Sequence, residues 1–308
     1  LAQATPSDDG LKTVYTSLLE SYVTGPCVEL LGPMLDVSLS VFRAVQQRFV
    51  RAGTTQSQHY NFGTHSLNGL MRSLASIHEL LSAATADEFW RTWKHEMNRT
   101  FRDSLSTQDD CEWYDAILER TVDAIVSSPI ENRWCACIAE NADYAEYTEL
   151  MDVQSQVVSG LTAHGQTDKI VCPDVTLGVM RMRRLIAQRR NCIMFGSHFG
   201  RRDICRMSSK LAGSEYRDIT LYDWDRSVKS WRSNIREWLH NAMATGTHLV
   251  IFISCSEDLD ERFMVELDAL LHGRLPELFF SPDEFAQCVA QMRMGSESGS
   301  REAVLRKR

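Results

Sequence analysis

The residues with the clearest chemical pattern lie in one run of the sequence, NCIMFGSHFGRRDICR at 191–206. A short apolar segment at 192–195 predicts a buried strand, and Ile204, Met207 and Leu211 recur at the spacing of one helical face. A turn with two glycines lies between these elements. Strand, glycine turn and helix form the layout of a phosphate-binding loop, because backbone N–H groups and the helix N-terminus point toward the same anion there.

This predicted loop departs from the complete phosphate-binding pattern. The pattern G-x-x-x-x-G-K-[S/T] requires a glycine where Phe195 stands, a lysine where Arg201 stands and a magnesium-binding hydroxyl where Arg202 stands. The guanidinium of Arg201 can still pair with a phosphate, whereas Arg202 offers no ligand to a metal ion. Two interpretations therefore stay open: a degenerate nucleotide loop, or a plain glycine turn. In the first, the cofactor-binding residues are Gly196, Ser197, His198, Phe199, Gly200, Arg201, Arg202 and Asp203.

A second strand, expected at 248–253, bears on the same question. In proteins that hydrolyse nucleotides, such an apolar strand ends in an acidic residue that holds magnesium, and a neighbouring carboxylate polarises the attacking water. Here Cys255 stands at the aspartate position, and Glu257 and Asp258 lie beyond it. Because the loop and the end of this strand are both altered, we predict that the chain does not hydrolyse nucleotide. We expect no metal, and weak or absent binding of ATP or ADP.

The composition fits a soluble globular protein with room for two domains. Of 308 residues, 44% are hydrophobic and 24% are charged, and the net charge of −8 gives no general reason to expect nucleic acid. None of the nine cysteines is spaced as a CxxC pair, which favours free thiols in a reducing compartment over a zinc site. The sequence shows no signal peptide and no transmembrane run. Because it begins with Leu1, we expect a fragment of a longer protein.

Residues 11–165 read as nearly all helix, after a segment 1–10 that is predicted to be disordered. Two apolar stripes mark the first helices. The first stripe is Val14, Leu18 and Leu19; the second is Leu35, Leu39, Phe42, Val45 and Phe49. Gly–Pro pairs at 25–26 and 32–33 are expected to break these helices.

Two later helices in this region have distinct signals. One is expected to start with Thr64 or Ser66 as its N-cap. The other starts at Asp87, and on it His95 and Glu96 look like half of a metal motif. No second histidine follows at helical spacing, so a packed helix is predicted instead of a metal site.

From about 166 the pattern changes to alternating strands and helices. Strands are expected at 217–221 and 248–253, and helices at 175–187, 231–239 and 259–271. This alternation predicts βαβ units. The predicted fold class is therefore α+α/β: a helical region at 11–165, then an incomplete P-loop-type α/β domain at 166–308 with a mostly parallel sheet.

A group of arginines surrounds the predicted loop. Its members are Arg181, Arg183, Arg184, Arg189, Arg190, Arg201, Arg202 and Arg206. One interpretation is contact with phosphate or nucleic acid, which salt would weaken steeply. The other is a solvated helix face with salt bridges. The net charge of −8 favours the second.

Taken together, these segments resemble the dynein heavy chain family, in the part of its AAA+ ring that runs from the lid of the third module into the large domain of the fourth. The lid resemblance lies in LKTVY at 11–15, HYNF at 59–62, FWRTWKHE at 89–96 and RTFRDSL at 99–105. The fourth-module resemblance lies in the loop 196–203, the strand 248–253 and GRLPELF at 273–279, followed by Asp283 and Glu284. The Gly-Arg-Arg sequence at 200–202 is most similar to the cytoplasmic dynein of intraflagellar transport.

The resemblance implies a microtubule-based, ATP-driven motor as the parent protein. This segment departs from the family pattern at the loop, and also at His65, where many lids carry a sensor arginine. It is therefore expected to be a structural, force-transmitting part of the ring that does not hydrolyse ATP by itself.

The resemblance also implies partners and a location. The partners are the rest of the heavy chain, neighbouring AAA+ modules and, through the parent complex, intermediate chains, light chains and microtubules. Nucleic acid and membrane insertion are not expected. The implied location is the cytoplasm and cytoskeleton, including the cilium or flagellum. The alternative is a stand-alone, non-catalytic interaction protein derived from a motor gene.

Overall fold

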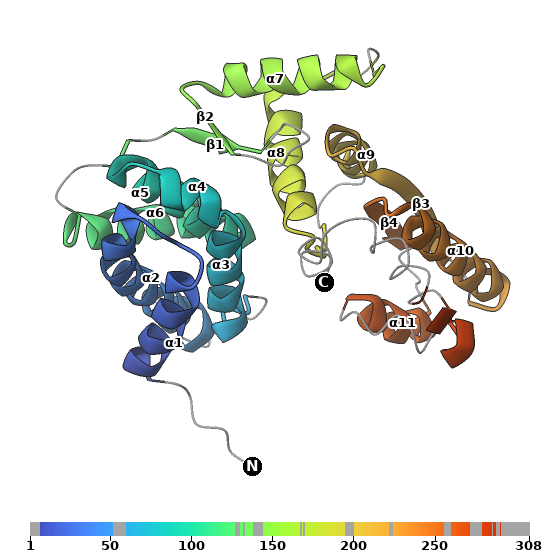
Figure 1. The fold of residues 1–308 in the computed structure, drawn as a ribbon, viewed down its shortest axis with the longest axis horizontal. Coiled ribbons are helices and arrows are strands. Elements are labelled where there is room, and N and C mark those ends of the chain that lie inside the picture. The colour runs from blue at the N-terminus through green and yellow to red at the C-terminus, as the bar shows by residue number, and fades with distance from the viewer. Residues whose placement is uncertain are drawn as a thin grey trace. The chain divides into compact units, whose positions relative to one another are not determined.

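Two compact units make up the chain. The computed structural model describes residues 7–51, 60–126, 130–131, 133–137, 144–166, 168, 170–194, 200–221, 224–255, 260–271, 279–284, 286–287 and 290. The first unit comprises residues 1–136 and 143–153, and the second comprises residues 137–142 and 154–308. The first holds helices and a short hairpin, whereas the second holds helices around two parallel strands (Figure 1). This composition confirms the predicted α+α/β class.

The first unit is built from helices α1 to α6. Their bounds are α1 (Asp8–Glu20), η1 (Pro26–Leu30), α2 (Leu31–Val45), η2 (Gln46–Arg51), α3 (Thr64–Ser76), α4 (His78–Ala83), α5 (Ala86–Thr100), η3 (Arg102–Ser104) and α6 (Gln108–Asp123). The antiparallel strands β1 (Trp134–Ala136) and β2 (Ala145–Tyr147) follow. Helix α7 (Leu150–Ala163) contains residues of both units. None of the helices that the structure describes combines the length and apolar character that crossing a bilayer requires.

Helix α1 buries the predicted stripe only in part: Leu19 is in the core and Leu18 packs against it. Leu11, Tyr15 and Leu19 are buried, whereas Val14 is 63% exposed. The prediction of an inward-facing Val14 is therefore wrong. Both sets of residues recur at helical spacing, and the buried one includes Tyr15, whose hydroxyl is satisfied by a hydrogen bond to the side-chain oxygen of Asn68.

The starts of α1 and α2 also differ from the sequence analysis. Helix α1 begins inside the segment 1–10, because the Ser7 hydroxyl accepts a hydrogen bond of 3.1 Å from the backbone N–H of Gly10. Helix α2 runs through Gly32 and Pro33, so the break predicted there is wrong. A proline is tolerated in the first turn of a helix because its missing N–H would have no partner within the helix.

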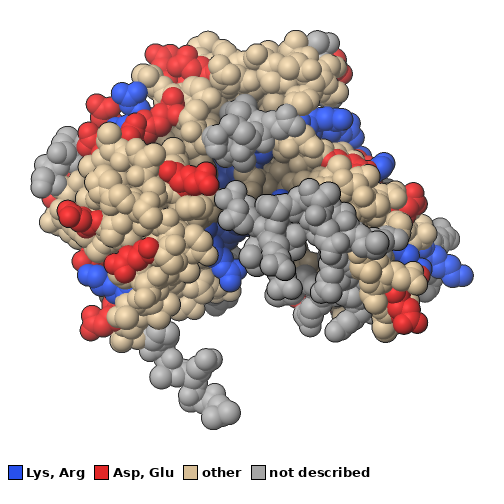
Figure 2. Space-filling model, in the orientation of Figure 1, with Lys and Arg blue, Asp and Glu red and all other residues tan. Residues whose placement is uncertain are grey.

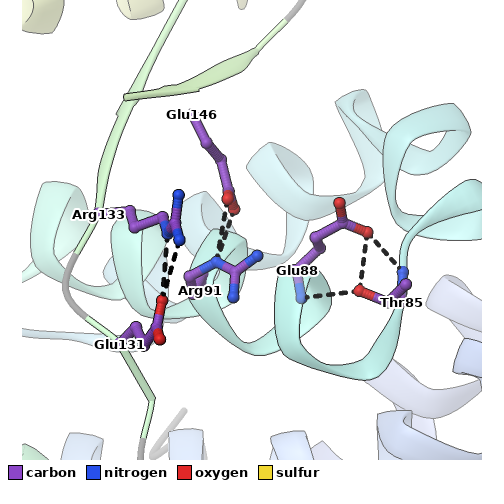
Figure 3. A network of polar contacts seen from close by, with 6 residues as sticks. All are labelled: Thr85, Glu88, Arg91, Glu131, Arg133 and Glu146. Carbon is purple, nitrogen blue, oxygen red and sulfur yellow. Dashed lines mark hydrogen bonds and ion pairs between the residues drawn. The ribbon is translucent and has the colours of Figure 1, made fainter. Parts of the chain in front are cut away.

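Helices α3 and α5 start with different caps. The N-cap of α3 is Gly63 and makes no side-chain hydrogen bond, so the prediction that Thr64 or Ser66 caps this helix is wrong. Thr64 is itself the first helical residue. Helix α5 begins with a complete capping box, in which Thr85 and Glu88 each bond to the other's backbone N–H. Figure 3 shows this pair.

The hairpin β1–β2 is attached to α5 by polar contacts. The Arg91 guanidinium donates to both carboxylate oxygens of Glu146, at 2.9 and 3.0 Å (Figure 3). Further along α5, the carboxylate of Glu96 is buried and accepts a hydrogen bond of 2.7 Å from the Tyr144 hydroxyl. Glu96 is thus a buried hydrogen-bond acceptor on a packed face of α5.

The second unit places helices on both faces of a small parallel sheet. Its elements are α8 (Pro173–Ala187), α9 (Arg201–Leu211), β3 (Glu215–Leu221), α10 (Trp224–Thr245), β4 (Leu249–Cys255) and α11 (Glu261–Leu271). Strands β3 and β4 pair in parallel from Glu215 opposite Leu249 to Leu221 opposite Cys255. Alternate residues therefore face opposite sides. One face packs with α8 and α9 through Tyr216, Val250 and Phe252; the other packs with α10 and α11 through Ile219, Leu221, Ile251 and Ile253.

The segment before the loop is not a strand where the structure describes it. Residues 192–194 have no assigned strand, and Ile193 is 66% exposed. The predicted strand at 192–195 is therefore wrong at these positions, while Phe195 lies outside the described residues. Among the described residues β3 and β4 pair only with each other, so this apolar segment has no ladder partner there. Met194 nevertheless packs in the same cluster as Val250 and Phe252.

Candidate functional site

The described part of the predicted loop is the turn into α9. Gly200 is the N-cap of this helix and has φ 85° and ψ −21°, in the left-handed region that favours glycine. It makes no side-chain hydrogen bond, and the exposed Asp203 places a negative charge in the first helical turn. Gly196, Ser197, His198 and Phe199 lie outside the described residues. The local backbone thus fits a turn that presents a helix N-terminus.

Arg201, at the position of the expected lysine, interacts with the chain itself. Its guanidinium donates a hydrogen bond of 2.8 Å to the backbone carbonyl of Met194. This contact ties the first residue of α9 to the segment that precedes the loop. A guanidinium held in this way is a positive charge close to the turn, but part of its donor capacity is used within the protein.

Arg202, at the position of the expected magnesium-binding hydroxyl, is directed toward the sheet. Its Nε lies 3.3 Å from a carboxylate oxygen of Asp218, and its Nη2 donates to the Thr220 hydroxyl at 3.2 Å. Its guanidinium carbon also lies 5.9 Å from the ring centroid of Phe252. One turn further along α9, Arg206 lies 3.5 Å from the same Asp218 oxygen.

With these contacts, the residues at this site fit a simple anion better than a magnesium–triphosphate. The turn at Gly200 and the start of α9 fit an anion, because a helix N-terminus presents N–H groups. A magnesium–triphosphate does not fit as well, because the side chain that would supply the metal oxygen is an arginine bound to β3. At the end of β4 Cys255 stands at the second metal position; the residue is largely exposed, and partial desolvation of its thiol raises the pKa. Glu257 and Asp258 lie outside the described residues, and the described ones contain no group of metal-ligating side chains.

The arginines grouped by the sequence do not form one surface. Arg183 and Arg184 are buried in α8, with 1% and 5% of their surface exposed. Arg189 has a positive φ of 51° just beyond that helix. Burial lowers the pKa of His248, and the charges of Arg189 and Arg183 lower it further. On the face drawn in Figure 2, described acidic and basic side chains form small separate groups.

The ion pairs of Arg202 and Arg206 agree with the second interpretation of the arginine group. Arg183 and Arg184 are buried, so the solvated helix face of that interpretation does not describe them. Sequence reasoning missed Asp218 and Thr220 altogether. The only available signal was the alternation of Asp218 and Thr220 with the apolar Ile219 and Leu221 at the end of the strand.

The sensor position of the lid resemblance falls on an exposed side chain. His65 lies in the first turn of α3 and is exposed. The described residues of the first unit therefore show a surface imidazole at this point. The family-like sequence at 89–96, by contrast, lies on α5.

Two known families match separate parts of the chain. The family described as "Dynein heavy chain, ATPase lid domain" matches residues 17–111, and the family described as "P-loop containing dynein motor region D4" matches residues 168–306. The two ranges together take in most of the chain and fall in the order that the sequence resemblance predicts. The chain belongs to the dynein heavy chain family. The loop residues 196–203 lie inside the second match, whose description names a P-loop.

Individual relatives support the same assignment over nearly the whole chain. The cytoplasmic dynein heavy chain of Caenorhabditis elegans is 24% identical over 289 residues, which cover 89% of this chain. Dynein axonemal heavy chain 9 of Homo sapiens is 22% identical over 321 residues, and dynein axonemal heavy chain 1 of Mus musculus is 22% identical over 285 residues; they cover 94% and 86% of this chain. The chain spans only 6% to 7% of the length of these relatives. Cytoplasmic and axonemal proteins both occur among them.

Proposed function

We propose that this chain is a structural segment of a microtubule-based, ATP-driven dynein motor, and that its own nucleotide site is degenerate. One observation carries the proposal. The two positions where a lysine and a hydroxyl would hold a magnesium–nucleotide are arginines, and their side chains bind the Met194 carbonyl and Asp218. A site arranged in this way is suited to holding a module together, not to turning nucleotide over.

The mechanical role follows from the two units. A helical lid and an α/β domain in an AAA+ ring can pass on the closure of neighbouring modules as rigid-body rotation. ATP or ADP, if bound at 196–203, would act as a structural wedge through Arg201, without a metal ligand from Arg202. Replacing Arg201 with alanine is expected to abolish any measurable nucleotide binding. Retained binding would remove this loop from the proposal.

The partners and location belong to the parent protein. We infer the rest of the heavy chain and the adjoining AAA+ modules as direct partners, and intermediate chains, light chains and microtubules as partners of the whole complex. The inferred location is the cytoskeleton, in the cytoplasm or in a cilium. The Gly-Arg-Arg sequence at 200–202 favours the class that drives intraflagellar transport.

The size of the native polypeptide tests whether the chain works as part of a motor. An antibody raised against the helical unit would be used on a blot of endogenous protein. A band of several hundred kilodaltons is the expected result. A band near 35.1 kDa would contradict the motor proposal, and a stand-alone interaction protein would replace it.

A further inference from the structure

We propose that Asp218 is the centre of a built-in latch that holds the N-terminal turns of α9 against the sheet without a bound anion. Two guanidinium groups converge on one oxygen of this carboxylate. Arg202 Nε lies 3.3 Å from Asp218 Oδ2, and Arg206 Nη2 lies 3.5 Å from the same atom. Because Arg202 and Arg206 are one turn apart, they lie on the same face of α9 and can bind one group together.

Each arm of the latch is also held by a second contact on the sheet. Arg202 donates to the Thr220 hydroxyl and lies over the Phe252 ring, whereas the guanidinium carbon of Arg206 lies 5.4 Å from the ring centroid of Tyr216. Positions 216, 218 and 220 share one face of β3, since side chains alternate along a strand. In the parallel register Asp218 stands opposite Phe252, which places the carboxylate and the ring side by side on this face.

This arrangement does internally what a phosphate does in a nucleotide-binding loop. In such a loop, an external anion draws the helix N-terminus and the basic side chain together. Here the negative charge comes from β3, three residues before the strand ends. On the other side of the helix start, Arg201 binds the Met194 carbonyl. The first two turns of α9 are thus tied both to the sheet and to the segment before the loop.

The consequence is a module whose α9 does not change position with nucleotide. This inference rests on the proposed function, in which the loop is degenerate, and it names what replaces the ligand. The ion pairs are partly exposed, with side-chain exposures of 47% for Arg202, 41% for Arg206 and 32% for Asp218. Each pair alone is therefore weak, and the latch depends on their sharing one carboxylate.

Hydrogen exchange of the 308-residue chain, read on peptides that cover 201–211, tests the latch. Asp218→Asn keeps the size of the side chain and removes its charge. It is expected to speed exchange in the first two turns of α9 roughly tenfold, the combined effect of two partly exposed pairs. Glu215→Gln is the matched control, because Glu215 lies on the same strand but pairs with Arg217, which is also on β3. It should leave α9 exchange unchanged.

Single-arm variants keep the test decisive if Asp218→Asn does not fold, as judged by circular dichroism. Arg202→Gln and Arg206→Gln each remove one arm and should each give part of the increase. No change in α9 exchange in Asp218→Asn, or in both single-arm variants, would overturn the latch.

A parallel arm with millimolar ATP separates the latch from the proposed function. The wild-type chain should show the same α9 exchange with and without ATP. Slower exchange with ATP would contradict the degenerate site, whereas an unaffected Asp218→Asn variant would contradict only the latch. Failure of the latch and failure of the degenerate site therefore give different results.

Discussion

Glu266 gives the sharpest stability prediction, because a buried carboxylate joins two helices of the second unit. Its side chain is 3% exposed and lies on α11, which follows β4 along the chain. The indole N–H of the fully buried Trp231, on α10, donates to Glu266 Oε2 at 2.6 Å. Arg232 donates to the other oxygen from Nε at 2.8 Å and also from Nη2. This carboxylate therefore fixes where α11 lies.

Two substitutions separate these contacts. Glu266→Gln keeps an acceptor for the indole and loses the ion pair with Arg232. Since Arg232 is 48% exposed, we expect a loss of only about 1 kcal/mol. Glu266→Met has a similar length but leaves the buried indole N–H of Trp231 without an acceptor. It should cost about 3 kcal/mol, because the charge-assisted bond is lost and a buried donor is left unpaired.

Local opening free energies from hydrogen exchange of α10 and α11 provide the assay, because a chain with two units need not unfold in one step. A Trp231→Phe background supplies the control, since it removes the indole donor in advance. There, Glu266→Met should cost much less than in the wild type. If the Met variant is within about 0.5 kcal/mol of wild type, or if Gln and Met cost the same, the buried indole bond does not have the assigned role.

Two further predictions concern the helical unit. Thr85→Ala should destabilise the start of α5 by about 1 kcal/mol near neutral pH, measured by hydrogen exchange of α5, because the hydroxyl half of its capping box is lost. The pKa of Glu88 lies below its ordinary 4.5 because the Thr85 backbone N–H and then the Thr85 hydroxyl bond to the carboxylate. This stabilisation is present above the ordinary pKa and is lost as the pH falls through the folded-state value. The backbone bond remains in Thr85→Ala, so only the part of the difference that comes from the hydroxyl–carboxylate bond should shrink in acid. Tyr114→Phe should leave the stability of α6 unchanged or raise it by about 0.5 kcal/mol, because the buried Tyr114 hydroxyl has no hydrogen-bond partner among the described residues. A loss above about 1 kcal/mol in the local opening free energy of α6, from hydrogen exchange, would mean that the hydroxyl is satisfied.

Helical periodicity predicted most of the fold, and its failures have physical causes. The stripe from Leu35 to Phe49 is buried as expected, because one apolar face left no other choice. On helix α1 the buried side includes Tyr15 and leaves Val14 exposed, and the bond of Tyr15 to Asn68, 53 residues further on, is a contact that spacing along the chain does not show. An apolar run such as 192–194 is compatible with a strand, but a strand also needs a neighbour with which to pair.

The candidate site was predictable only in part for the same reason. The pattern identified the Gly200 turn and the two arginine substitutions, which depend on sequence alone. It did not identify Asp218, because the meeting of α9 with β3 depends on the strand register and on helix packing. The burial of Arg183 likewise follows from tertiary packing and not from its neighbours in the sequence.

Calorimetric titration of the 308-residue chain with ATP, in magnesium and then in EDTA, tests the central claim most directly. We expect binding weaker than about 1 mM or none, the same result in both buffers, and no release of phosphate. This outcome follows from Arg202, which occupies the metal-ligand position and is bound to Asp218. Magnesium-dependent binding in the micromolar range, or hydrolysis, would contradict the account of a degenerate, structural module.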